Sequence, residues 1–223
     1  MKPRHIVVKI VKSNEALLKS FKTHKELYKF AVEKGLTNSA LEFFYFKDAL
    51  FEIGINYYRL EEDTLNEMES ILEEKNEVLR KKINKKIVLY SSASFTDKSF
   101  AICDIYFDPV WFGTFFKDPK NYSNACLDSA QKAIYAACEF KKQNEIEAIE
   151  LKLIVDAQWL HTNYIYKKMS IVLSQQAIKN NIVLDLQSTY ASNNPANKYI
   201  LKLKEGQKNY MKLNISCISL FKT

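Results

Sequence analysis

Glycine and paired cysteines are scarce in this sequence of 223 residues. Only four glycines occur, and no Gly-x-Gly or Walker-type run is present. Because a phosphate-binding loop needs glycines where its backbone approaches the ligand, this scarcity argues against a dinucleotide or nucleoside-triphosphate site. The four cysteines form no Cys-x-x-Cys pair. Cys126 and Cys138 fall within one expected helix, so we expect buried thiols in a reducing compartment.

Long apolar runs are also absent from the sequence. No window of about 18 apolar residues occurs, which is the length that a membrane-spanning helix requires. Near the beginning of the chain, Lys2, Arg4 and Lys9 interrupt the apolar residues, so we expect no secretory signal peptide. These features favour a cytoplasmic protein without a membrane partner.

Basic residues outnumber acidic ones. The chain has 33 Lys and Arg against 26 Asp and Glu, which gives a net charge of +7 and a pI of about 9.0. Such a surface favours anionic partners, of which nucleic acid is the commonest. A lysine-rich composition without any such partner is the alternative. The content of 47% apolar and 26% charged residues is typical of a globular chain that can bury a core without disulfides.

The N-terminal region predicts a short strand followed by helices. Residues 5–12 form a short segment rich in β-branched residues, and this composition predicts a strand. Residues 13–33 predict a helix, and residues 39–58 predict a second helix so rich in aromatic residues that we expect it to be buried or to dock on a partner. Residues 61–86 predict an exposed helix with a narrow apolar stripe. Its basic end is either favourable charge at a helix C-terminus or a phosphate contact.

The sequence pattern changes at Ile87. From there the signals follow the order strand, strand, a possible third strand, helix, strand, helix, strand, helix and a final extended segment. We expect strands at residues 87–90, 100–107, 111–116, 150–155 and 182–186, helices at 123–142, 163–179 and 195–205, and the extended segment at 210–220. The sequence therefore predicts an α/β protein with an N-terminal region, residues 1–86, and a second domain, residues 87–223.

Four motifs of the second domain resemble those of the ribonuclease H family, over residues 87 to about 206. Residues 87–95 (IVLYSSASF) occupy the place of the family's first strand and its Thr-Asp-Gly/Ala-Ser signature. Residues 129–137 (SAQKAIYAA) keep the small-residue pattern of the helix that carries a catalytic Glu. Residues 155–160 (VDAQWL) match the Asp-Ser-Gln-Tyr end of the fourth strand, and residues 190–203 (YASNNPANKYILKL) match the last loop and helix. The resemblance implies a ribonuclease H-like mixed sheet flanked by helices.

The catalytic positions of that family are mostly replaced here. Family members hold two divalent ions with four clustered carboxylates, because hard cations need anionic oxygen ligands. The matching positions read Ser92, then Ala130 or Ser129, then Asp156, then Leu201 or Ile200, with Tyr190 at the position of the loop histidine. Asp156 alone remains, and a lone Asp is not expected to hold two Mg²⁺ ions. Its other interpretation is a cap on backbone N–H groups at the end of the strand.

A metal site rebuilt from other acids is an alternative. Asp104 on the second strand would join Asp156 as a catalytic residue and bind Mg²⁺ or Mn²⁺ with it; otherwise no cofactor is expected. Asp97 and Asp185 are further acids of the region. Asp128 precedes the expected helix position by one or two residues, about 100–200° around the helix, so we expect it to point elsewhere.

Aromatic and histidine side chains near these motifs add little to the interpretation. Trp111 and Trp159 are more typical of a core or an interface than of a base-stacking platform. His161 is the one histidine near the expected site in sequence. An acetyltransferase fold shares part of the order of elements, but residues 160–165 lack the glycines that its pyrophosphate loop needs.

The first functional hypothesis is a catalytically degenerate ribonuclease H-like protein, a pseudoenzyme. It would bind RNA or an RNA–DNA hybrid by its shape and backbone, or bind a protein. The candidate phosphate contacts are Lys132, Lys167, Lys168, Lys198 and Lys202. The alternative is an active metal-dependent ribonuclease with rearranged carboxylates that cleaves RNA–DNA hybrids. The third hypothesis is a structural subunit that docks through the aromatic helix at residues 39–58.

Overall fold

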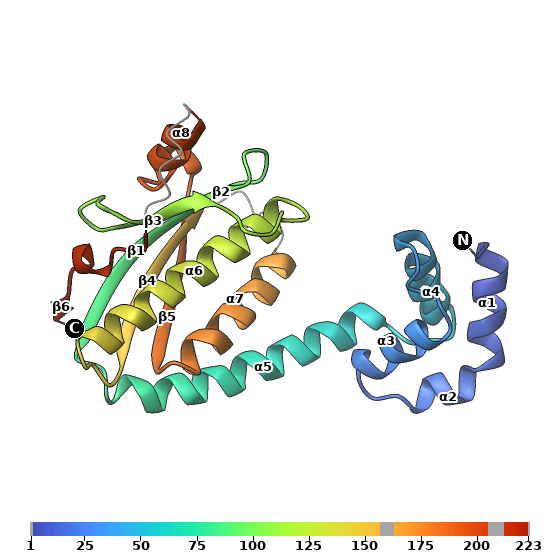
Figure 1. Ribbon diagram of the computed structural model, residues 1–223. Helices are drawn as coiled ribbons and strands as arrows, with labels where there is room; N and C mark the ends of the chain where they lie inside the picture. The colour runs from blue at the N-terminus through green and yellow to red at the C-terminus, as the bar shows by residue number, and fades with distance from the viewer. Residues whose placement is uncertain (1, 157–162, 205–211, 223) are drawn as a thin grey trace. The chain divides into compact units, whose positions relative to one another are not determined.

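A computed structural model describes residues 2–156, 163–204 and 212–222 (Figure 1). The chain divides into two compact units, residues 1–69 and residues 70–223. The boundary between them falls within a long helix, α5 (Tyr57–Arg80), whereas the change of sequence pattern at Ile87 lies near the beginning of the sheet. Each unit has an apolar core of its own.

The first unit is helical throughout its described part. Before α5 it contains α1 (Arg4–Ser13), α2 (Glu15–Ser20), α3 (His24–Glu33) and α4 (Ala40–Glu52). The strand expected at residues 5–12 is wrong, because these residues form α1. Val7 and Val11 are four positions apart, so the helix buries both on one face, and this burial outweighs the strand preference of β-branched residues.

Local caps set the ends of α3 and α4. The helix expected at residues 13–33 is two helices, because Thr23 begins α3 in a capping box with Glu26. Ser39 caps α4 by accepting a hydrogen bond of 3.1 Å from the N–H of Glu42. After α3, Gly35 takes a φ of 61°, in the left-handed region that favours glycine.

Aromatic rings fill the core of the first unit. Phe46 of α4 is fully buried, and its ring stacks on those of Phe30 and Phe43 at centroid distances of 6.2 and 6.1 Å. The opposite side of α4 is exposed, and Phe51 is 69% accessible to solvent. The aromatic segment expected to be buried or to dock is therefore buried on one side only.

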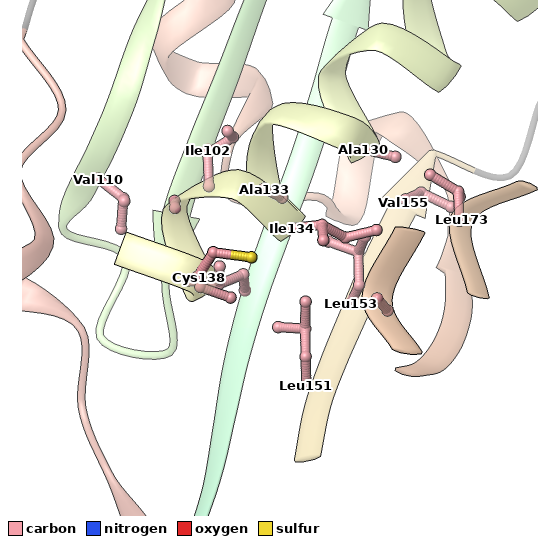
Figure 2. Close-up of a cluster of buried hydrophobic side chains, with 14 of the residues drawn as sticks. Ile102, Val110, Ala130, Ala133, Ile134, Cys138, Leu151, Leu153, Val155 and Leu173 are labelled. Carbon is pink, nitrogen blue, oxygen red and sulfur yellow. The ribbon is translucent and has the colours of Figure 1, made fainter. Parts of the chain in front are cut away.

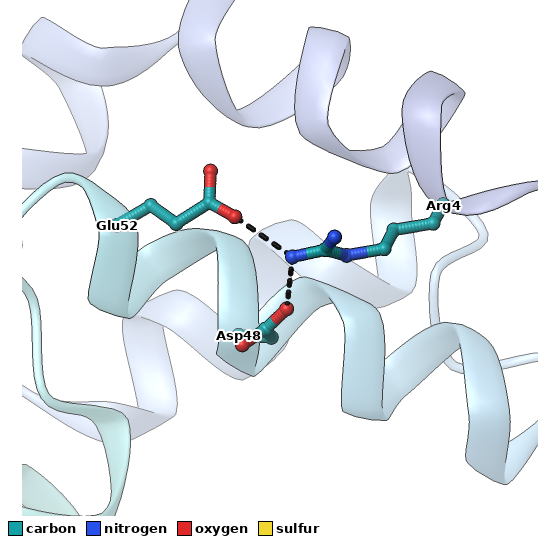
Figure 3. A network of polar contacts seen from close by, with 3 residues as sticks. All are labelled: Arg4, Asp48 and Glu52. Atoms are coloured by element: carbon teal, nitrogen blue, oxygen red, sulfur yellow. Dashed lines mark hydrogen bonds and ion pairs between the residues drawn. The ribbon is translucent and has the colours of Figure 1, made fainter.

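An exposed ion-pair network joins α1 to α4 at the surface of the first unit. Figure 3 shows the Arg4 guanidinium between Asp48, at 2.7 Å, and Glu52, at 2.9 Å. The two carboxylates are four residues apart, so they lie on the same face of α4.

The second unit is α/β with a mixed sheet, which confirms the fold class predicted from the sequence. The strands are β1 (Lys85–Ser94), β2 (Ser99–Asp104), β3 (Pro109–Thr114), β4 (Ile149–Asp156), β5 (Ile182–Thr189) and β6 (Phe221–Lys222). The order across the sheet is β3-β2-β1-β4-β5, with β6 beside the first residues of β1. The first three strands pair antiparallel, and β1, β4 and β5 pair parallel.

Helices cover both faces of this sheet. The helices α6 (Tyr122–Gln143) and α7 (Asn163–Ile178) pack with the sheet in the main apolar cluster, whereas α8 (Asn197–Lys204) packs on the other face in a smaller cluster with Ala101 and Cys103. Figure 2 shows Ala133 and Ile134 of α6 near Leu153 of β4. Small residues along α6 let this helix lie close to the strands.

Two further expectations are resolved by the structure. The segment expected to be extended at residues 210–220 contains a 3₁₀ turn, Ile215–Cys217, in its described part. Among the residues that the structure describes, none of the helices combines the length and the apolar character needed to cross a lipid bilayer.

Candidate functional site

Strand pairing brings the ends of β1 and β4 together. These strands are parallel, and Ser91 is in register with Val155. Ser92, two residues before the end of β1, therefore lies beside Asp156, the last residue of β4. Val155 belongs to the core beneath α6. Because side chains alternate along a strand, Asp156 points to the opposite face of the sheet, as Ser92 does.

Asp156 lies in a buried cluster of polar side chains. Only 2% of its surface is exposed. Its carboxylate accepts hydrogen bonds from Ser92 Oγ at 2.7 Å, Asn194 Nδ2 at 2.7 Å and the Ala93 backbone N–H at 3.4 Å. Asn194 is buried too; Nδ2 also donates to the Ser91 carbonyl, and Oδ1 accepts from the Ala196 N–H. Both carboxylate oxygens are therefore occupied by donors of the protein itself.

Burial changes the pKa of Asp156. Desolvation raises the pKa of this carboxyl above its ordinary value, and the hydrogen bonds from Ser92, Asn194 and Ala93 offset only part of that rise. A cluster of metal ligands would need ionised oxygens instead.

Ser129 of α6, rather than Ala130, faces β1 from the helical side. Its hydroxyl donates to the Ser92 carbonyl at 2.9 Å and lies 2.7 Å from Ser91 Oγ. Because the one hydroxyl hydrogen of Ser129 is used on that carbonyl, Ser91 supplies the hydrogen between the two hydroxyls. Ala130 packs in the apolar core. At the position that the resemblance equates with the helical Glu, Ser129 therefore makes a hydrogen bond to the backbone of β1.

The remaining matched positions are either exposed or packed among apolar residues. Leu201 is 49% exposed, and Ile200 is buried among apolar residues on α8. Tyr190, at the position of the loop histidine, is 71% exposed. Asn194 contacts Asp156 in their place, although the sequence alone gave this residue no expected role. The signal that could have found it is a polar residue at the N-terminal side of α8, within the fourth matched motif.

Asp104 does not join the Asp156 cluster. It is fully buried and accepts hydrogen bonds from the N–H groups of Tyr106 and Asp108, both at 2.9 Å, in the turn after β2. Asp104 is paired with Leu89, three residues before Ser92 on β1, which is about 10 Å along the strand. In addition, β2 and β4 flank β1 on opposite sides. The geometry assigns Asp104 to the turn rather than to a metal shared with Asp156.

The other acids considered from the sequence do not complete a metal site. In the three described ranges of the chain, no group of three or more His, Cys, Asp or Glu side chains is placed to hold a metal ion. Trp159 and His161 lie outside the described residues.

The five candidate phosphate contacts lie on three helices. Lys132 is on α6 and Lys167 and Lys168 are on α7, whereas Lys198 and Lys202 are on α8, on the other face of the sheet. The structure brings Lys198 and Lys202 together: their ammonium groups lie 4.8 and 5.2 Å from the centre of the Tyr199 ring. The five residues therefore do not form one stripe.

No family model matches the chain, and no curated protein is significantly similar to it.

Proposed function

We propose that this chain is a catalytically degenerate ribonuclease H-like protein that binds nucleic acid through residues 70–223. The order of the strands, with α6 between β3 and β4 and α7 between β4 and β5, supports the resemblance that the four motifs suggest. The observation that carries the proposal is the buried Asp156 cluster. Where the resemblance implies four clustered carboxylates, only Asp156 remains. It accepts hydrogen bonds from Ser92, at one of the matched positions, and from Asn194, in the loop before α8.

The chemistry of the cluster favours loss of two-metal catalysis. Divalent cations at such a site need several anionic oxygens to replace part of their water shell. Here the hydroxyl of Ser92 and the amide of Asn194 supply the positive ends of dipoles to Asp156, so hydrogen bonds take the place of a cation. The raised pKa of Asp156 further lowers its value as a ligand.

The distribution of charge supports nucleic acid as the partner. Residues 1–69 contain 11 basic and 11 acidic side chains, whereas residues 70–223 contain 22 basic and 15 acidic ones. The net charge of +7 therefore belongs entirely to the second unit. A basic surface of this kind attracts the phosphate backbone irrespective of sequence.

A paired cleavage and binding experiment tests the proposal. The full chain is mixed with a labelled RNA–DNA hybrid in Mg²⁺ or Mn²⁺, and we expect binding that weakens steeply with salt but no cleavage. Replacing Lys198 and Lys202 with Gln should reduce the salt dependence, whereas replacing Lys9 and Lys12 of the first unit with Gln should not.

Two outcomes would contradict the proposal. Cleavage that Asp156→Asn abolishes would support the active metal-dependent ribonuclease instead. Absence of any binding to the hybrid, to single-stranded RNA and to single-stranded DNA would remove nucleic acid as the partner.

A protein partner of the first unit is a second candidate function. Phe44, Phe51 and Tyr58 are exposed around a small pocket of about 160 Å³, which also contains Lys47 and Asp48. Exposed aromatic groups of this kind are enriched at protein interfaces. Cross-linking of the full chain in native extract should yield a defined complex. Phe51→Ser should abolish this complex, whereas binding to the RNA–DNA hybrid should persist. A complex that forms equally well with Phe51→Ser would refute this role.

A further inference from the structure

A groove between α6 and the edge strand β3 has the character of a small-ligand site. Its volume is about 560 Å³, within the range of about 300–1,000 Å³ that is usual for such sites. It is lined by Trp111, Asp128, Gln131, Lys132, Tyr135 and Leu213. The groove is separate from the Asp156 cluster, because α6 and Asp156 lie on opposite faces of the sheet.

Aromatic rings hold the charge of Lys132 in place at this groove. Its ammonium lies 5.2 Å from the ring centre of Phe100, 5.6 Å from that of Trp111 and 5.9 Å from that of Phe115. These distances are typical of cation–π contacts. No carboxylate of the described residues lies within ion-pairing distance of Lys132. Its positive charge is therefore fixed in position but not neutralised by an ion pair there.

Asp128 is one helical turn before Lys132, yet the two do not pair. Opposite charges four residues apart on a helix commonly attract each other directly. Here the ammonium lies over the rings instead, and within the described part of the chain Asp128 has no ion pair. One groove thus presents a cation and a carboxylate separately, which suits a ligand that carries both an anionic group and a hydrogen-bond donor.

The walls of the groove offer rings on which a planar group can stack. Trp111 meets Phe100 edge to face at 5.2 Å and lies 6.2 Å from Tyr135 at an angle of 49°. Tyr135 is 49% exposed, and Trp111 is only half-buried. Trp111 packs against the main core, as the sequence favoured, and it also lines this groove.

We propose that this groove binds one unpaired nucleotide of an RNA or DNA strand. The inference rests on the proposed nucleic-acid function and adds a single-strand site to it. The base stacks on Trp111 and meets the inclined ring of Tyr135 at an angle. Lys132 contacts the phosphate, and Asp128 accepts a hydrogen bond from an exocyclic amine of the base. A nucleotide satisfies the three requirements of the groove together: a planar ring, an anion and a donor.

Tryptophan fluorescence tests the site directly. Trp111 and Trp159 are the only tryptophans in the chain, so Trp159→Phe leaves Trp111 as the single reporter. In this background, adenosine monophosphate and a short oligoadenylate should quench the emission, whereas ribose 5-phosphate should not. Tyr135→Ala or Lys132→Gln should weaken the binding about tenfold, whereas Lys179→Gln, on an exposed lysine outside the groove, should leave it unchanged.

Asp128 provides a test of how the base is recognised. Inosine monophosphate lacks the exocyclic amine of adenine, so it should bind more weakly than adenosine monophosphate. Asp128→Asn should remove this preference while circular dichroism shows an unchanged fold.

The outcomes separate this inference from the proposed function. If the full chain binds the RNA–DNA hybrid but no nucleotide or oligoadenylate quenches Trp111, the groove is not a nucleotide site and the proposed function stands. Quenching that Tyr135→Ala and Lys132→Gln leave unchanged would also overturn the inference. If neither hybrid nor nucleotide binds, both proposals fail.

Discussion

The first unit fills its core with stacked aromatic rings, whereas the second places a polar cluster at the edge of a largely aliphatic core. Phe30, Phe43 and Phe46 form the centre of the first core. In the second, Ser92, Asp156 and Asn194 are nearly inaccessible to solvent, and they bond to one another. Both arrangements satisfy the atoms involved, and the cluster of the second unit does so with three polar side chains shielded from water.

This difference bears on function. A buried polar group is costly unless it is hydrogen-bonded, and well-packed apolar residues can often replace a buried charge without loss of stability. Packing alone therefore does not explain why Asp156 is found at this place. The proposed loss of metal chemistry, with hydrogen-bond donors around the one remaining carboxylate, would account for its place. The first unit also buries a carboxylate, that of Glu42, which accepts hydrogen bonds from the Lys2 N–H and the Ser39 hydroxyl at the beginning of α4. Its exposed aromatic groups favour a protein partner.

The largest expected effects come from truncating each core separately. We expect Phe46→Ala to destabilise the first unit by about 4 kcal/mol and Ile134→Ala to destabilise the second by about 3 kcal/mol, since both side chains are fully buried. Both tryptophans lie in the second unit, so their fluorescence reports on that unit, while far-ultraviolet circular dichroism reports on both. Urea titrations followed by the two signals check the prediction.

That experiment tests whether the two units unfold independently. Phe46→Ala should shift the dichroism transition without shifting the fluorescence transition. An equal shift of both signals would mean that the two units unfold cooperatively, and the contrast between their cores would then have no separate energetic meaning.

The next effect concerns Asn194, which joins the loop before α8 to the polar cluster. Asn194→Ala removes donors to the Ser91 carbonyl and to Asp156, so we expect a loss of about 2 kcal/mol in the stability of the second unit. The neighbouring Asn193 is exposed, so Asn193→Ala is a matched control that should cost almost nothing. Equal effects of the two variants in fluorescence-detected urea unfolding would show that the cluster contributes no stability.

A smaller and pH-dependent effect is expected from Asp156. Because burial raises its pKa above the ordinary value of 3.8, the folded chain retains this proton to higher pH than the unfolded chain does. Its contribution to stability is therefore fully present below pH 3.8 and is lost as the pH rises through the folded pKa. Asp156→Asn removes this contribution.

The measurement is the difference in free energy of unfolding between the wild type and Asp156→Asn at a series of pH values. We expect the wild type to lose stability relative to the variant as the pH rises. Taking the difference cancels the groups with lowered pKa, such as Glu73, whose effects have the opposite sign. A difference that grows in favour of the wild type with rising pH would show that the native pKa of Asp156 is lowered.

Periodicity was enough to predict most of the second unit. The strands beginning near Ile87 and Ile149, and the helix that contains Ala130 and Ala133, follow patterns that depend only on which residues face the core. The same reasoning failed for residues 5–12, because Val7 and Val11 satisfy both strand preference and helical spacing. Burial against the rest of the first unit decides between them, and local sequence does not contain that information.

The candidate site was predictable only in part, since its contacts depend on register and loops. The sequence placed Ser92 and Asp156 near the ends of two predicted strands, and the structure joins them by a hydrogen bond. Which of Ser129 and Ala130 faces the polar residues of β1 depends on how α6 is rotated about its axis, and the structure shows that it is Ser129. Asn194 was missed because the alignment to a helical position pointed to Leu201, whereas a loop supplies the contact. The structure places Asp104 in the turn after β2, and the sequence pattern did not reveal how far that turn lies from the end of β4.

The smallest effect is expected at the surface of the first unit, where Arg4 pairs with Asp48 and Glu52. All three side chains are well exposed, so solvent and salt screen the attraction. Arg4→Gln should lower the midpoint of thermal unfolding of the first unit slightly at low ionic strength, and the difference should vanish near 1 M salt, where charges are screened within about 3 Å. Arg59→Gln removes the same charge from an exposed position that has no ion pair among the described residues, so it should leave the midpoint unchanged. An effect of Arg4→Gln that persists in 1 M salt, or one that Arg59→Gln reproduces, would show that net charge or side-chain packing, rather than this ion-pair network, is what α1 and α4 require.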